Sequence, residues 1–325
     1  MTQVKGFSSL SPSAKPPTMN RTGLFVALGL CLVIGILFGL YPELDLKLAA
    51  YFFDAAAKTF PWKLDAIAAF ARDAAMWIAW GFVLPSIVAL AYKFLRPDRP
   101  LLVKGRTVIF LLVTMLLSAG VLTNLLFKSY WGRPRPVVVT QFNGPEPFVA
   151  WWDPRGTCAK NCSFFSGEGA TAFWTYAPAA LAPAPWRPLA YIGATVFGTV
   201  TSGLRMAFGG HFFTDVTIAG LVTFLVIWLF YALIYRWPRT RLTDERVDAA
   251  LTRDGEGTSK VALGGAHARR VLQLAGGVLE TEAEDLAPLR RDVLTQALVG
   301  QIAKFGRLHH WPSSRNTNLV FTGSL

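Results

Sequence analysis

The residues of this chain most suited to chemistry lie in three stretches: Lys128–Pro136, Ser166–Glu168 and Arg205–Asp215. The first stretch supplies Lys128 and Arg135, and the third supplies Arg205. Guanidinium groups bind tetrahedral oxyanions through paired hydrogen bonds, and an ammonium binds them as a point charge. A single such cation is equally consistent with a side chain that reaches a membrane surface. Three that meet at one place predict a site for a phosphate-like anion.

The third stretch also contains a candidate nucleophile. His211 and Asp215 are four residues apart, so they share a face if a helix begins near His211. An aspartate that accepts from one ring nitrogen fixes the tautomer and raises the basicity of the other nitrogen. The imidazole is then able to attack phosphorus. The alternative is a histidine that is merely hydrogen-bonded at a helix start.

The second stretch has the features of a helix start. Ser166 is a typical N-cap residue, and the backbone amides that follow it, beginning at Gly167, favour an anion. Glu168 places a negative charge at the same position. No second histidine or carboxylate cluster accompanies these residues, so we expect no metal site.

Long apolar segments must position these residues. The chain has 325 residues, 53% of them hydrophobic, and four segments contain no charged residue: Thr22–Tyr41, Ala75–Tyr92, Thr107–Phe127 and Val216–Tyr235. Each is close to the ~20 residues that cross a bilayer as a helix. Two weaker segments, Ala170–Pro185 and Pro188–Leu204, bring the prediction to six spans in an all-α bundle, with the first span retained rather than cleaved as a signal peptide.

The basic residues near the span ends predict the orientation. Lys93, Arg96, Arg99, Lys104 and Arg106 lie between the second and third spans, which places that side in the cytoplasm. With six spans, all three chemical stretches then meet at the opposite, periplasmic face. We expect a multi-pass protein of a bacterial inner membrane whose site faces the periplasm.

The remaining segments divide the chain further. We predict a disordered cytoplasmic arm (1–21), a membrane domain (22–241) and a polar cytoplasmic tail (242–325) with a helix over Leu289–Phe305. Glu43–Ala74 is predicted to form an interfacial helical hairpin on the outer leaflet, broken at Pro61. Cys158 and Cys162 lie on the predicted outer side, and the sequence leaves open whether they form a disulfide or remain two thiols.

The three stretches read K-x6-RP, SG-x and R-x5-H-x3-D, and this pattern resembles the type 2 phosphatidic acid phosphatase (PAP2) superfamily, which includes the vanadium haloperoxidases. The resemblance covers about residues 107–235 and implies a PAP2/haloperoxidase-like fold. It implies that His211 attacks phosphorus with support from Asp215, without metal or cofactor. It further implies that Lys128, Arg135, Arg205, Ser166 and Gly167 hold the phosphoryl oxygens.

Two residues depart from the family pattern. Leu204 replaces the usual serine, and Glu168 replaces the histidine that protonates the leaving oxygen. Three roles are open for Glu168: a general acid, a partner that tunes the cations or contacts the substrate, or the mark of an inactive relative. The form Cys-Ser-x-x-Ser-Gly-Glu resembles bacterial members related to the lipid A phosphatases.

These features predict an enzyme that hydrolyses a phosphomonoester or diphosphate of a membrane lipid, such as lipid A, through a phosphohistidine. The alternatives are a lipid-to-lipid phosphotransferase, an undecaprenyl diphosphate phosphatase and a non-enzymatic membrane scaffold. The net charge of +12 fits basic loops at a bilayer, and no soluble basic domain suggests nucleic acid as a partner. The sequence specifies neither the phosphate position nor an oligomeric state.

Overall fold

Helices are the main regular structure in the part of the protein that the structure describes. The computed structural model describes the backbone of residues 21–263 and the side chains of residues 21–254. Within these residues there is no β-strand, only two isolated bridges between loop residues. Nearly all of the predicted arm (1–21) and the predicted helix Leu289–Phe305 lie outside the described residues.

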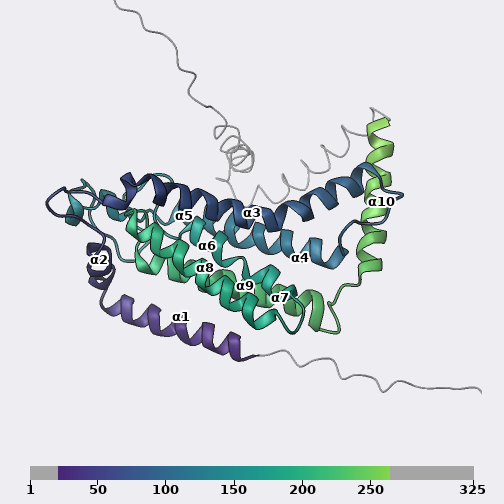
Figure 1. Cartoon of the computed structure of the whole chain (residues 1–325), viewed down its shortest axis with the longest axis horizontal. Helices are drawn as coiled ribbons and strands as arrows, with labels where there is room; N and C mark the ends of the chain where they lie inside the picture. Colours follow the sequence, from purple (N-terminus) through teal and green to yellow (C-terminus); the bar gives the residue numbers. More distant parts are fainter. Residues whose placement is uncertain (1–20, 264–325) are drawn as a thin grey trace, which may run out of the picture. The chain divides into compact units, whose positions relative to one another are not determined.

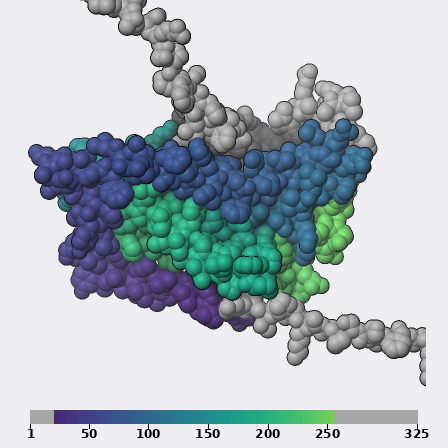
Figure 2. Space-filling model, viewed as in Figure 1, coloured from purple at the N-terminus to yellow at the C-terminus, as the bar shows by residue number. Residues whose placement is uncertain are grey.

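Four of the predicted spans are long apolar helices (Figure 1). They are α1 (Thr22–Leu40); α3 (Ala66–Leu95); α4 (Gly105–Met115) with its continuation η2 (Leu116–Phe127) and α5 (Lys128–Tyr130); and α9 (Phe213–Tyr231) with η5 (Ala232–Arg236). Many large apolar side chains of α1 and α3 are exposed. In Figure 2, α3 is blue and α1 is purple. Such exposure is expected where the surrounding solvent is lipid.

The two weaker predicted segments, Ala170–Pro185 and Pro188–Leu204, fold differently from long apolar spans. The segment predicted as Ala170–Pro185 forms two short helices, α6 (Gly167–Phe173) and α7 (Tyr176–Leu181), followed by α8 (Arg187–Ala207). None of the three meets the length and hydropathy of a membrane span. The described structure therefore holds four clear candidates, and the six-span count is not confirmed.

Small residues let α6 pack deep inside the bundle. A Cβ atom placed on Gly198 of α8 would lie 2.3 Å from the ring of Phe173, and one on Gly220 of α9 would lie 2.5 Å from it. Phe173 is thus held between two glycines, as expected where helices approach closely in a membrane. In Figure 1, α6, α8 and α9 lie between α1 and the α3–α4 pair.

The predicted outer hairpin is not confirmed. Its first arm is the short helix α2 (Glu43–Ala50), and η1 (Pro61–Leu64) follows a loop. Its second arm is not a separate helix, because α3 runs without interruption from Ala66. Asp65 caps this helix by accepting from the amide of Ala68 at 2.7 Å, and no helix breaker follows before Pro85.

A buried ionic group ties together α2, α9 and the long loop between α5 and α6 (residues 131–166). Arg133 donates to Asp45 at 2.7 Å and to Asp215 at 2.5 Å, and all three side chains are almost fully buried. Thr214 binds the same carboxylate of Asp45 through its amide and its hydroxyl. Sequence analysis assigned no role to Arg133. The structure shows that it is the central cation of the fold at this end.

Helix α10 (Asp244–Leu263) begins inside the predicted polar tail. Asp244 pairs with Arg106 at 3.1 Å, and Asp248 pairs with the buried Lys93 at 3.0 Å. The start of this helix is therefore joined to the ends of α3 and α4. The described residues up to position 259 form one compact unit.

We predict that Arg133→Gln lowers the free energy of unfolding by about 3–5 kcal/mol, because it leaves two buried carboxylates without their cation. Denaturant unfolding of the purified protein in detergent micelles measures this. Arg155→Gln is the matched control, since Arg155 makes an exposed pair with Asp153 in the same loop and its loss should change little. Equal effects of the two substitutions would contradict the role of Arg133.

Candidate active site

The structure brings the three chemical stretches together at one end of the helices. The amide of Ser166 donates to the backbone oxygen of Asp215 at 3.1 Å. A Cβ on Gly167 would lie 3.2 Å from the ammonium of Lys128, and one on Gly210 would lie 2.6 Å from the guanidinium of Arg205. Backbone and side chains of all three stretches are therefore in contact.

His211 is buried, and its hydrogen bond defines its tautomer. Nδ1 lies 2.7 Å from the backbone oxygen of Ser163. A carbonyl oxygen only accepts, so Nδ1 carries the proton and Nε2 carries a free lone pair. Burial lowers the pKa of His211 to about 3, and the cations Arg205 and Arg135 act in the same direction. The imidazole is therefore neutral at pH 7, which is the nucleophilic form.

Asp215 does not orient His211 in the way that the sequence predicted. Its carboxylate is 3.8 Å from Nδ1, beyond hydrogen-bonding distance, because helix α9 begins at Phe213 and leaves His211 outside it. One carboxylate oxygen accepts instead from the hydroxyl of Ser163 and from the amide of Phe212, and the other from Arg133. Asp215 thus holds the backbone on both sides of the imidazole.

Glu168 lies between two guanidinium groups. Its Oε2 is 3.2 Å from Nε of Arg205 and 3.5 Å from Nε of Arg72. These are the partners that a carboxylate takes. The contacts lack hydrogen-bond geometry, and all three buried atoms remain without a hydrogen-bond partner. Buried donors in this state are available to another acceptor, such as a phosphoryl oxygen.

The other predicted site residues lie near His211 or in the loop beside it. Ser166 is buried and caps α6 by accepting from the amide of Gly169 at 3.1 Å. Lys128 and Arg135 both donate to Asn161. Cys158 and Cys162 are joined by a disulfide, with 5.7 Å between their Cα atoms. Among the described residues, no three His, Cys, Asp or Glu side chains gather as a metal site would require.

Comparison with known proteins agrees with this geometry. A model of the PAP2 superfamily matches residues 107–239. The chain is 33% identical over 222 residues to a lipid A 4′-phosphatase of Francisella tularensis subsp. novicida, an alignment that covers 67% of this chain and 98% of the relative. The chain belongs to the PAP2 superfamily. The predicted resemblance is confirmed, and this PAP2 protein is a membrane lipid phosphatase.

Two further PAP2 relatives match over shorter regions. A lipid A 4′-phosphatase of Rhizobium etli is 35% identical over 112 residues, which is 34% of this chain and 44% of the relative. One of Rhizobium leguminosarum is 33% identical over 113 residues, which is 35% of this chain and 48% of the relative. No solved structure matches the chain.

Sequence reasoning missed four residues of this PAP2 site: Arg72, Arg133, Asn161 and Ser163. A signal existed for Arg72, because Arg72 and Asp73 are the only charged residues between positions 66 and 92. No local pattern marks Asn161 or Ser163, which act through backbone atoms and through contacts with distant segments.

We predict that the protein becomes less stable relative to its His211→Asn variant as the pH falls from 7 to 5. The folded state resists protonation of His211 down to about pH 3, whereas an unfolded histidine takes up a proton near 6.5. Stability contributed by the neutral ring is complete above pH 6.5 and is lost as the pH falls towards 3, by at most about 1.4 kcal/mol per pH unit.

Unfolding curves of both proteins in micelles at several pH values test this. Asparagine keeps an N–H donor for the Ser163 carbonyl but does not titrate, and the carboxylates common to both proteins cancel in the difference. Parallel stability curves would show that His211 is not held neutral by burial.

Proposed function

We propose that this phosphatase removes the 4′-phosphate of lipid A at the periplasmic face of a bacterial inner membrane. The observation that carries this proposal is a buried, neutral imidazole of His211 on which the charges of Arg205 and Arg135 act. Arg135 shares a ligand, Asn161, with Lys128, and the three matching relatives of the chain are all named lipid A 4′-phosphatase. A phosphomonoester supplies the anion that such a group of cations binds.

The proposed reaction proceeds in two displacements. Nε2 of His211 attacks phosphorus, the bond from phosphorus to the sugar oxygen breaks, and that oxygen takes a proton. Water then attacks the phosphohistidine, the P–N bond breaks and inorganic phosphate leaves. The cations neutralise the phosphoryl oxygens throughout, and the effect is strongest for a buried cation such as Arg205.

The surroundings of His211 support this role. As the ring gains positive charge on attack, the proton stays on Nδ1, which donates a hydrogen bond to the carbonyl oxygen of Ser163. Asp215, fixed by Arg133, holds Ser163 through its hydroxyl and Phe212 through its amide. We assign Asp215 a positioning role, exerted mainly through the groups on either side of the ring rather than through a hydrogen bond to the ring itself.

Glu168 is proposed to act as the general acid while pairing with cations in the resting site. A 4′-phosphate leaves an ordinary sugar alkoxide, which needs a proton. A phosphoryl dianion that takes the guanidinium of Arg205 removes a resting partner from Glu168. The resting ion pairs therefore do not conflict with an acid role.

The orientation and the six-span topology are part of the proposal. The interrupted pair α6–α7 and helix α8 would supply an inward and an outward crossing between the third span and α9. The disulfide at the active-site end fits an oxidising compartment, as does the concentration of Lys and Arg at the opposite end of α3 and α4.

An apolar groove supports a lipid as the substrate. It has a volume of about 440 Å³ and is lined by Ile78 and Phe82 of α3, by Pro178 of α7 and by Gly193 and Phe197 of α8. The same helices, with α6, carry Arg72, Glu168 and Arg205 at their outer ends. Six residues of α3, about 9 Å of helix, separate Arg72 from the groove, so an acyl chain there would lie below a phosphate held in the site.

We predict that the purified protein releases phosphate from lipid A faster than from phosphatidate, phosphatidylglycerophosphate or undecaprenyl diphosphate, and that His211→Ala abolishes the release. A phosphate-release assay on this panel measures both. Preference for undecaprenyl diphosphate would favour that alternative, and transfer of labelled phosphate to an added lipid would identify a phosphotransferase. Full function of His211→Ala in cells would favour a scaffold.

We predict that Glu168→Gln slows hydrolysis of phosphate esters with poor leaving groups by ~10²–10⁴-fold and leaves esters with good leaving groups nearly unaffected. Turnover of soluble aryl and alkyl phosphates by the variant and the wild type measures this. An equal loss for both classes would reject the acid role. It would favour the alternative in which Glu168 pairs with Arg72 and Arg205 and tunes the cations.

A further inference from the structure

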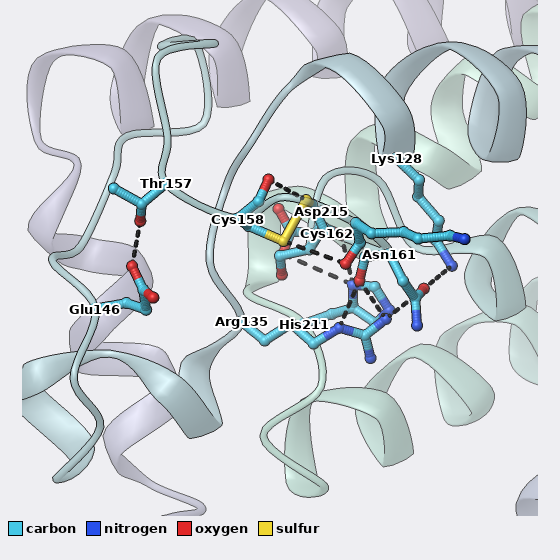
Figure 3. The surroundings of a disulfide bond; sticks show 11 residues. Lys128, Arg135, Glu146, Thr157, Cys158, Asn161, Cys162, His211 and Asp215 are labelled. Carbon is cyan, nitrogen blue, oxygen red and sulfur yellow. Dashed lines mark hydrogen bonds and ion pairs between the residues drawn. A yellow bond between two sulfur atoms is a disulfide. The ribbon is translucent and has the colours of Figure 1, made fainter.

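Asn161 occupies the donors that the phosphate is expected to use. Its backbone oxygen accepts from Nε and Nη2 of Arg135 at 3.1 and 2.9 Å. Its side-chain Oδ1 accepts from Nη2 of Arg135 at 2.9 Å and from Nζ of Lys128 at 3.5 Å (Figure 3). Two oxygens of one residue thus contact two of the three predicted phosphate-binding cations.

The geometry is that of an anion substitute. The Nε–Nη2 edge of a guanidinium is one that grips two oxygens of a carboxylate or phosphate in parallel. Asn161 presents its two oxygens to this edge of Arg135. The edge cannot bind phosphoryl oxygens in the same way while Asn161 remains there, so the two ligands compete.

The loop that carries Asn161 is anchored beside the cations. The disulfide Cys158–Cys162 closes it. The amide of Cys158 donates to the oxygen of Gly132 at 2.9 Å, and the amide of Ser163 donates to the oxygen of Arg133 at 2.8 Å. Both ends of the loop are therefore tied to the segment that leads into Arg135. Asn161 itself has a φ of +55°, a conformation that asparagine tolerates better than most residues.

We propose that Asn161 is an internal ligand of the phosphate-binding cations, displaced when a phosphoryl group binds, and that the disulfide holds it in position to compete. This inference rests on the proposed function of the same cations. A neutral amide is a weaker partner for Arg135 and Lys128 than a phosphoryl dianion, so substrate displaces it. Its return lowers the affinity for inorganic phosphate and so assists release of that product.

The test is calorimetric titration of the full-length protein in detergent with inorganic phosphate. Asn161→Gly keeps the backbone conformation but removes Oδ1, and we expect it to bind phosphate roughly three- to tenfold more tightly, which is the worth of one hydrogen bond. Asn161→Asp should bind phosphate at least as much more weakly, because a carboxylate holds both cations more strongly. Asn143→Gly is the matched control, since Asn143 has a φ of +62° in an exposed part of the same long loop, and it should bind as the wild type does.

Opening the loop should act in the same direction as Asn161→Gly. The double variant Cys158→Ser/Cys162→Ser is expected to bind phosphate more tightly than the wild type, because both oxygens of Asn161 are then free to leave Arg135. Cys31→Ser is the control for a cysteine-to-serine change that leaves the disulfide intact. Thermal unfolding of each variant shows whether it is folded.

The outcomes separate this inference from the proposed function. If the wild type binds phosphate and Lys128→Ala does not, while Asn161→Gly and the double variant bind as the wild type does or more weakly, the internal-ligand proposal is overturned and the phosphate site stands. If no form binds phosphate, the proposed function fails and the inference fails with it.

Discussion

The buried contact of Arg133 with Asp45 and Asp215 is the constraint on which the active end of the molecule depends. It joins the short helix α2, the long loop between α5 and α6 and the start of α9, three segments that lie far apart along the chain. Because Asp215 also holds Ser163 and Phe212, the position of the imidazole follows from this charge arrangement. Two carboxylates around one guanidinium are costly to bury, and we propose that they serve the geometry that they fix around His211.

The site itself is a balance of opposite charges at short range. Four positive groups lie at the site: those of Lys128, Arg135, Arg205 and Arg72. In the structure they are countered by Glu168, which contacts Arg205 and Arg72, and by the neutral oxygens of Asn161, which contact Arg135 and Lys128. Each cation therefore has a resting partner weaker than a phosphoryl dianion. This arrangement keeps mutually repelling side chains in place without filling the site permanently.

Much of this could be read from the sequence, and the omissions share one cause. Uncharged runs of about 20 residues predicted the four long helices, because a bilayer imposes that length. The spacing of Lys128, Arg135, Arg205 and His211 predicted the family that comparison confirmed. Sequence analysis missed the break between α6 and α7 and the roles of Arg133 and Arg72. Each depends on a partner more than 80 residues away or on packing between helices, and neither leaves a periodic trace in the chain.

The ring of Phe173, held between Gly198 and Gly220, has a consequence for how such enzymes diverge. Five residues before this ring, on the same short helix, stands Glu168. The position of the Glu168 carboxylate along the bundle therefore depends on the two glycines that let Phe173 pack closely. An added methyl group at either glycine would push α6 outward and shift Glu168 relative to Arg205 and Arg72. Substitutions in the apolar interior are therefore restricted by the geometry of the charged site.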